Sequence, residues 1–168
     1  MKKILFITII IATSIFSAHS QDRPGISIFL HQTGMYYSSD NITSEGLGLG
    51  IGAHFLHKSQ IAGQVDANIL WGNGNAITTR IAAGYEKKGK WAPAIYATCN
   101  LLWGQRTEIL AENGDRPPLP AWAAGVRVTP LKFRTGRGYV SALEFGYGVG
   151  PAKAMSLEFS VLSIGIRF

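Results

Sequence analysis

The chain has 168 residues, of which 46% are hydrophobic and 20 are glycine, with a formal charge of +6 at pH 7 and one cysteine, Cys99. A single cysteine excludes an internal disulfide, and no apolar run near about 18 residues follows the N-terminal segment, which excludes a helical membrane span. A basic balance can indicate nucleic-acid binding, but basic and aromatic residues do not cluster here, which argues against nucleic acid as a partner.

The first residues have the composition of a secretory signal peptide. Lys2 and Lys3 precede an apolar run from Ile4 to Phe16, and small residues follow it. This run is shorter than the roughly 20 residues that a bilayer-spanning helix needs. We therefore predict a cleaved signal peptide over residues 1–20 and a single exported domain over residues 21–168. Without the two lysines the charge of this domain is +4.

After this segment, apolar residues alternate with small or polar ones in successive runs separated by polar turns. A period of two indicates β-strands. In the clearest run, Leu47, Leu49 and Ile51 alternate with glycines, so that one face is apolar and the other nearly bare. We predict eight strands, over residues 26–37, 46–55, 61–71, 77–86, 91–103, 122–129, 139–147 and 158–168.

The connections between these strands differ in length and charge. The connections after the odd-numbered strands include the longest and most acidic segment, residues 105–120. The connections after the fourth and sixth strands, residues 87–90 and 132–138, are short and basic. Such a contrast between long external loops and short periplasmic turns is typical of outer-membrane barrels. The facing of the first strand stays ambiguous, because Phe29 and Met35 interrupt its alternation.

The last run ends on a large apolar residue. Leu162, Ile164, Ile166 and Phe168 fall on one face of this strand. A C-terminal aromatic residue behind alternating apolar residues resembles the assembly signal of bacterial outer-membrane β-barrel proteins. The whole exported segment resembles the small barrels of the OmpA/OmpX class, which implies an all-β, eight-stranded antiparallel up-and-down transmembrane β-barrel.

This resemblance also implies a location and a set of partners. We expect a monomer in the cell outer membrane of a Gram-negative bacterium, in contact with outer-membrane lipid and lipopolysaccharide. The strand that ends in Phe168 is expected to be recognised by the barrel assembly machinery.

Aromatic residues on the apolar face are predicted to form two girdles. Trp91 and Trp103 lie twelve residues apart, which is about 40 Å of strand and, at a tilt near 45°, about 28 Å along the membrane normal. That distance is close to the height of the apolar band in such barrels. The predicted girdle residues are Trp71, Trp91, Trp103, Trp122, Tyr139, Tyr147 and Phe168.

The opposite face is predicted to fill the barrel with paired polar side chains. Buried charges cost several kcal/mol unless they are paired. A short connection between the third and fourth strands places Asp66 across from Arg80, and the same register continued into the fifth strand places Tyr96 opposite Arg80. An even-length turn can place Arg127 across from Glu144. We predict a plugged interior whose polar network comprises Asp66, Arg80, Tyr96, Arg127 and Glu144.

The sequence offers no catalytic, cofactor-binding or metal-binding set of residues. His54 and His57 have opposite parity and so form neither a catalytic dyad nor a metal pair, and His31 near Ser27 has no late His-x-Ser pattern to accompany it. We therefore predict a structural or surface-interaction role through the external loops, and no enzymatic activity. Two alternatives are a lipid A deacylase or acyltransferase, and a secreted lipocalin-like barrel for a small ligand, which the polar interior disfavours.

Overall fold

The computed structural model of the protein describes residues 25–40, 43–72, 76–103 and 121–168. The predicted signal peptide and the loop over residues 105–120 lie outside these ranges, so both stay predictions. Within the described ranges, no helix is sufficiently long and apolar to span a membrane.

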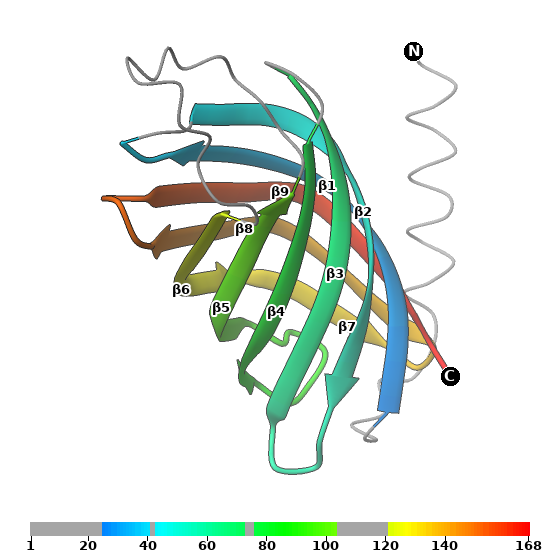
Figure 1. Ribbon diagram of the computed structural model, residues 1–168. Coiled ribbons are helices and arrows are strands. Elements are labelled where there is room, and N and C mark those ends of the chain that lie inside the picture. The colour runs from blue at the N-terminus through cyan, green and yellow to red at the C-terminus, as the bar shows by residue number, and fades with distance from the viewer. Residues whose placement is uncertain (1–24, 41–42, 73–75, 104–120) are drawn as a thin grey trace, which may run out of the picture.

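The described residues form a single antiparallel sheet of nine strands (Figure 1). These are β1 (Gly25–Ser38), β2 (Thr43–Leu56), β3 (Ile61–Gly72), β4 (Ala76–Glu86), β5 (Ala94–Trp103), β6 (Ala121–Thr129), β7 (Leu131–Thr135), β8 (Gly138–Val149) and β9 (Met155–Arg167). Consecutive strands from β1 to β6 pair with each other, as do β7 with β8 and β8 with β9. β1 also pairs with β9, and a pairing between β6 and β8 closes the sheet.

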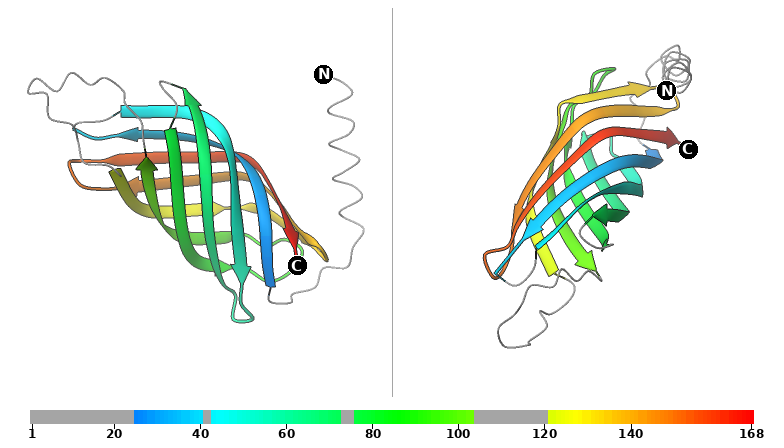
Figure 2. Two further views of the ribbon diagram at one scale, coloured as in Figure 1. Left: turned by 45° about the vertical axis from the view of Figure 1, so that its right-hand side comes forward. Right: turned by 90° about the horizontal axis from the view of Figure 1, so that it is seen from above.

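The strands β6 and β7 together form one strand of the barrel wall, by which we mean the closed sheet. Both pair with β8, and the register continues from Val128 opposite Phe145 to Leu131 opposite Ala142. The wall therefore has eight strands in up-and-down order, and the sheet curves round on itself (Figure 2). The predicted fold class, an all-β eight-stranded antiparallel up-and-down barrel, is confirmed.

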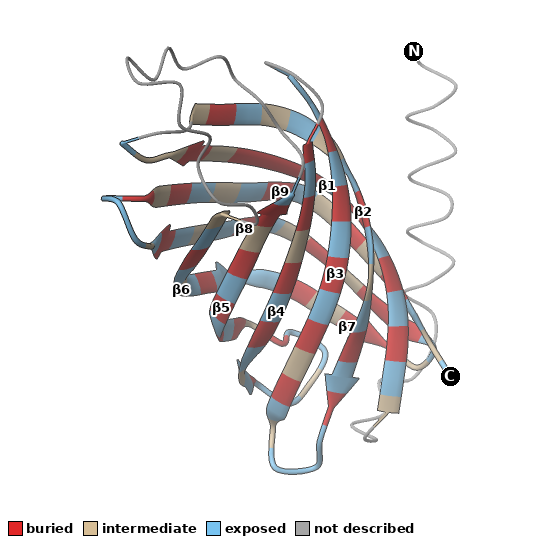
Figure 3. Cartoon of the chain, in the orientation of Figure 1, coloured by how far each residue is buried: buried red, intermediate tan, exposed pale blue. Residues whose placement is uncertain are grey.

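Buried and exposed residues alternate along the strands (Figure 3). On β3, Ile61, Val65 and Ile69 are each more than half exposed, whereas Asp66 and Asn68 between them are buried. This arrangement is the inverse of a soluble protein, in which apolar side chains cluster inside and polar ones face water. The apolar face of the barrel therefore points outward.

The facing of β1, ambiguous in the sequence, follows the same rule. Ile26, Ile28 and Leu30 are exposed on the outer surface, whereas Phe29 and Met35 are buried inside. The large inward side chain of Phe29 fits because Gly52 of β2 lies directly opposite it. A Cβ atom on that glycine would lie 2.6 Å from the tip of the phenyl ring.

The strand β6 ends at Thr129, as predicted, but the residues after Pro130 do not form the predicted turn. Proline removes one ladder hydrogen bond, but it does not by itself reverse the chain. Pairing with β8 resumes at Leu131, and the turn is confined to the residues between Thr135 and Gly138. Lys132 and Arg134, which we assigned to a basic turn, are consequently buried strand residues.

The fifth strand begins later than predicted. β5 starts at Ala94, directly after Pro93, whereas the alternation suggested a start at Trp91. Trp91 instead makes an isolated bridge to Phe133 of β7. The longer connection between β4 and β5 changes the register across this pair of strands.

The strand β8 reverses its facing at Leu143. This residue has a φ of 56°, in the left-handed region that leucine rarely adopts. Before it Tyr139 and Ser141 face inward, and after it Glu144 faces inward, so parity changes by one residue. A single extra residue in a strand reverses all later side chains. The prediction that Tyr139 belongs to the outer girdle is therefore wrong: it is 4% exposed and lies inside.

The strand β9 carries a matching irregularity. Its pairing with β1 shifts register between His31 and Gly34. Ser160 and Ser163 are consequently both buried although their parity differs. The last residues keep the facing that we predicted, with Ile166 exposed.

Glycine is required on the inner face where neighbouring strands come closest. Gly84 of β4 lies opposite Tyr96, and a Cβ atom at Gly84 would overlap the carbonyl oxygen of Ile95. The space at Gly63 on the outer face is different, because the nearest atom to an added Cβ would be the Ala82 carbonyl oxygen at 3.7 Å.

We predict that Gly84→Ala lowers the free energy of unfolding by about 1–3 kcal/mol, since the backbone of β5 has to move to admit a methyl group. Denaturant titration of the folded barrel in detergent measures this change. The matched control Gly63→Ala should stay within about 0.5 kcal/mol of the wild type. Equal stability of the two variants would show that the inner face has spare room.

Candidate functional site

The interior is the first candidate site, and an apolar cluster lies near each of its ends. We call the end with the connections after β1, β3, β5 and β8 the loop end, and the opposite end the turn end. At the loop end the buried cluster consists of Met35, Tyr37, Leu70, Ala76, Leu102, Ala123 and Ala154. At the turn end a second cluster consists of Leu56, Ala62, Ala82, Ala94 and Tyr96.

Arg80 is the centre of a network in the middle of the barrel. It lies opposite Asp66 in the register of β3 and β4, and its Nε donates to Asp66 Oδ2 at 2.9 Å. Its Nη1 donates to Glu158 Oε2 of β9 at 2.8 Å. Asn100 of β5 donates to the other oxygen of Glu158. The guanidinium thus joins strands that are not neighbours in the wall.

Arg127 and Glu144 form a second buried ion pair, between Nη2 and Oε2. Glu144 also accepts hydrogen bonds from Ser141 and, at 2.9 Å, from Ser163. The expectation that the pair lies directly across the ladder is wrong, because Arg127 faces Gly146. The two side chains meet diagonally instead.

The predicted position of Tyr96 opposite Arg80 is also wrong. Arg80 faces Asn100, and Tyr96 faces Gly84. The register moved because the connection between β4 and β5 extends to Pro93, beyond the short turn that we assumed. The Tyr96 hydroxyl instead donates to a carboxylate nearer the turn end.

That carboxylate, Glu86, is the centre of a network that sequence reasoning missed. It accepts hydrogen bonds from Tyr96 Oη at 2.8 Å, from Lys132 Nζ at 2.7 Å and from Arg134 Nε at 2.8 Å. His54 Nε2 lies 2.8 Å from Glu86 Oε2, the oxygen that also accepts from Tyr96 and Lys132. One fully buried carboxylate therefore contacts two cations.

Tyr139 completes this network through its ring. The Lys132 ammonium lies 4.0 Å from the centroid of the Tyr139 ring, a cation–π contact. The sequence did contain a signal for these residues, because Lys132 and Arg134 alternate with apolar Leu131 and Phe133. We did not use this alternation, because Pro130 suggested that the strand had ended.

Glu158 was missed for a different reason, because its partner Arg80 lies across the barrel.

The histidines are placed separately. His31 is buried, and neither of its ring nitrogens has a hydrogen-bond partner among the described residues. Its Nε2 lies 3.8 Å from Asp66 Oδ1. His57 is in an exposed turn, where its Nδ1 lies 2.8 Å from Ser59 Oγ. In the ranges that the structure covers, no group of three or more His, Cys, Asp or Glu side chains could hold a metal ion.

The outer face carries the other predicted residues. Trp103 Nε1 donates to Thr79 Oγ1 and Trp91 Nε1 donates to the Pro130 carbonyl oxygen, both at 2.9 Å. Their indole N–H groups are thus satisfied while their rings stay exposed. The outward aromatic residues are Trp71, Trp91, Trp103, Trp122, Tyr147 and Phe168, which are between 41% and 80% exposed.

Solved structures with the same architecture are known. Neisserial surface protein A is 11% identical with a TM-score of 0.53, over 89% of this chain and 99% of that one. The N-terminal β-barrel domain of Pseudomonas aeruginosa OprF is 12% identical with a TM-score of 0.55, over 87% of this chain and 100% of that one. The fold is that of the small eight-stranded outer-membrane barrels. No protein-family model and no curated protein matches the sequence.

We predict that Asp66 and Arg80 are energetically coupled. Each single alanine substitution should cost about 3 kcal/mol or more, because it leaves a buried charge with one partner fewer. The double variant should cost clearly less than the sum of the two. Denaturant titrations of the four proteins measure the coupling. As a control, Asp66→Ala combined with the remote Thr135→Ala should be additive within about 0.5 kcal/mol.

We also predict that Glu86→Gln lowers the free energy of unfolding by about 3–5 kcal/mol, since Lys132 and Arg134 lose their counter-charge. Adding Lys132→Met should recover part of that loss, because it removes one of the two buried cations. The same titration checks both variants, with Asp40→Asn at the exposed ion pair to Lys153 as a control of about 0–1 kcal/mol. A further loss on adding Lys132→Met would contradict the role of Glu86 as their counter-ion.

Proposed function

We propose that the protein is an integral outer-membrane barrel with an interior closed to diffusion, and that its role is structural or carried by the external loops. The observation that carries this proposal is the inversion of the two faces. The outer surface exposes isoleucine, leucine, valine and aromatic side chains on every wall strand, whereas the inward side holds the charges.

A bilayer is the solvent that suits this surface. Water-soluble monomers rarely expose apolar patches larger than a few hundred Å². In hydrocarbon the backbone polar groups of a wall must be paired internally, and a closed sheet without edges satisfies this requirement. Exposed tryptophans near both ends, such as Trp71 at the loop end and Trp91 at the turn end, suit the two membrane interfaces.

The interior supports a closed barrel. Eight strands enclose a space just wide enough for side chains, and here ion pairs occupy the middle while apolar clusters lie at both ends. A cavity of about 20 Å³ lies among Ser27, His54, Glu86 and Tyr139 at the turn end. It has room for about one water molecule. This packing supports an interior that admits neither a diffusing solute nor a lipocalin-type ligand.

A location in the outer membrane supports the following orientation and partners. The turn end faces the periplasm, and the loop end faces outward with outer-membrane lipid and lipopolysaccharide around it. Phe168 is 80% exposed, which supports its recognition by the barrel assembly machinery. At the loop end, Asp40 N donates to the Ala152 carbonyl oxygen at 3.0 Å, which joins two external connections.

Catalysis has less support than a structural role. A hydrolase needs a nucleophile beside a base that a third group orients. His57 and Ser59 do contact each other, but in the described part of the chain no third side chain orients this pair. The two buried histidines, His31 and His54, lie in separate networks.

Fractionation of a Gram-negative host that expresses the full chain tests the location. We expect the protein in the outer-membrane fraction, shortened by residues 1–20, with a gel mobility that changes on boiling because the barrel resists detergent. Recovery as a soluble periplasmic protein would contradict the membrane assignment.

Reconstitution tests the closed interior and the absence of catalysis. Vesicles that contain the purified barrel should stay as impermeable to small solutes as empty vesicles, and lipid A incubated with them should keep its mass. Solute flux would contradict the closed interior. A gain or loss of an acyl chain would replace the structural role with a lipid A-modifying one.

A further inference from the structure

An amide side chain faces outward among apolar residues. Gln32 lies near the middle of β1 and is exposed on the same face as Ile28 and Leu30. Thr79 also faces outward, but it accepts a hydrogen bond from Trp103 at 2.9 Å. No residue in the described ranges hydrogen-bonds to the amide of Gln32.

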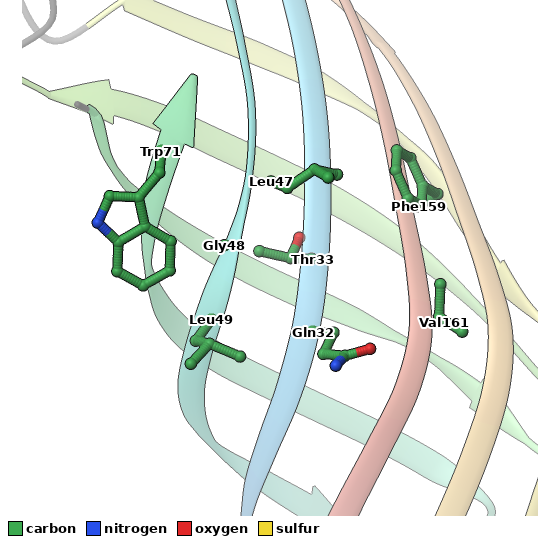
Figure 4. A pocket seen from close by; sticks show the side chains of 8 residues that line it. All are labelled: Gln32, Thr33, Leu47, Gly48, Leu49, Trp71, Phe159 and Val161. Atoms are coloured by element: carbon green, nitrogen blue, oxygen red, sulfur yellow. The ribbon is translucent and has the colours of Figure 1, made fainter. Parts of the chain in front are cut away.

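Gln32 lies between two apolar hollows of the outer surface. The hollow toward the loop end measures about 450 Å³ and is lined by Leu49, Trp71 and Val161 among others (Figure 4). The hollow toward the turn end measures about 500 Å³ and includes Leu30 and Ile164. Gln32 lines both of them. The surface here is therefore indented on either side of one polar group.

The indentation coincides with the irregular seam between the first and last strands. The register of β1 against β9 shifts between His31 and Gly34, which is the segment that contains Gln32. On the other side Gln32 lies opposite Leu49 of β2. Irregularities of this kind redirect side chains and end regular pairing. The fold thus presents the amide on a wall that departs from a smooth cylinder.

If the barrel lies in a membrane, as the proposed function holds, the Gln32 amide is energetically unfavourable unless another protein provides a hydrogen-bond partner. This inference therefore rests on the proposed function. Acyl chains offer no hydrogen-bond partner, and polar groups within the hydrocarbon region are costly. Glutamine side chains in membranes hydrogen-bond between neighbouring segments. A carboxamide carries both donors and an acceptor, so two copies of Gln32 related by a two-fold axis satisfy each other reciprocally.

We propose that this outer face of β1 and β9 is the interface of a homodimer. The Gln32 amides of the two copies hydrogen-bond to each other across the symmetry axis. The apolar rims of the two hollows, including Leu30, Leu49 and Val161, pack around them. In the monomer expected from the family resemblance, by contrast, this amide has no partner.

Site-specific crosslinking of the full chain in outer membranes tests the interface. In a Cys99→Ser background, which removes the exposed native thiol, Leu30→Cys keeps the Gln32 amide and should form a covalent dimer with a short thiol-reactive crosslinker. Leu30 is 63% exposed and lines the hollow beside Gln32. The matched control Ile81→Cys, equally outward and 58% exposed on β4, should stay monomeric. Equal crosslinking at both positions would indicate random collision, and adducts of residue 30 with other proteins would indicate a different partner. Either result overturns the proposal.

A second variant separates association from folding. Gln32→Leu should weaken self-association by about tenfold, measured by sedimentation equilibrium in detergent. It should leave the stability of the monomer equal or higher, because leucine suits lipid better than an amide. Thr79→Val is the control that keeps the dimer. A wild type that is monomeric yet membrane-inserted and heat-modifiable overturns the dimer and leaves the proposed function standing. A soluble chain overturns both.

Discussion

A closed wall with two opposite faces is the constraint on which the rest of the structure depends. Because β6 pairs with β8, the described sheet closes on itself, and the side chains of its strands point either outward or into a narrow bore. The inward charged side chains are buried, and a buried charge is stable only beside an opposite charge. Asp66 with Arg80 and Glu86 with Lys132 both meet this condition.

The two reversals in β8 and β9 determine which side chains reach these networks. A left-handed backbone at leucine costs about 1–2 kcal/mol, and Leu143 adopts one. In return Tyr139 reaches the ammonium of Lys132, while Ser141 hydrogen-bonds to Glu144. Strain in the wall is thus offset by contacts of the interior.

The same irregularity links the inner and outer surfaces. Beyond β8, the bulge continues into β9 and shifts the register against β1 beside Gln32. On the inner side the irregularity brings the Ser163 hydroxyl within hydrogen-bond distance of Glu144. On the outer side the irregular segment lies between the two hollows. One local departure from regular pairing therefore shapes both the polar core and the surface that we propose for self-association.

The sequence by itself determined the strands and most of their facing, because parity along an extended chain needs no tertiary information. It also placed Asp66 opposite Arg80, since a short connection leaves little freedom in register. Only the tertiary structure decided that the chain continues past Pro130, that Tyr139 turns inward, and that Arg80 reaches Glu158. These features depend on bulges, on a long connection and on contacts across the bore, which arise only when the sheet closes in three dimensions.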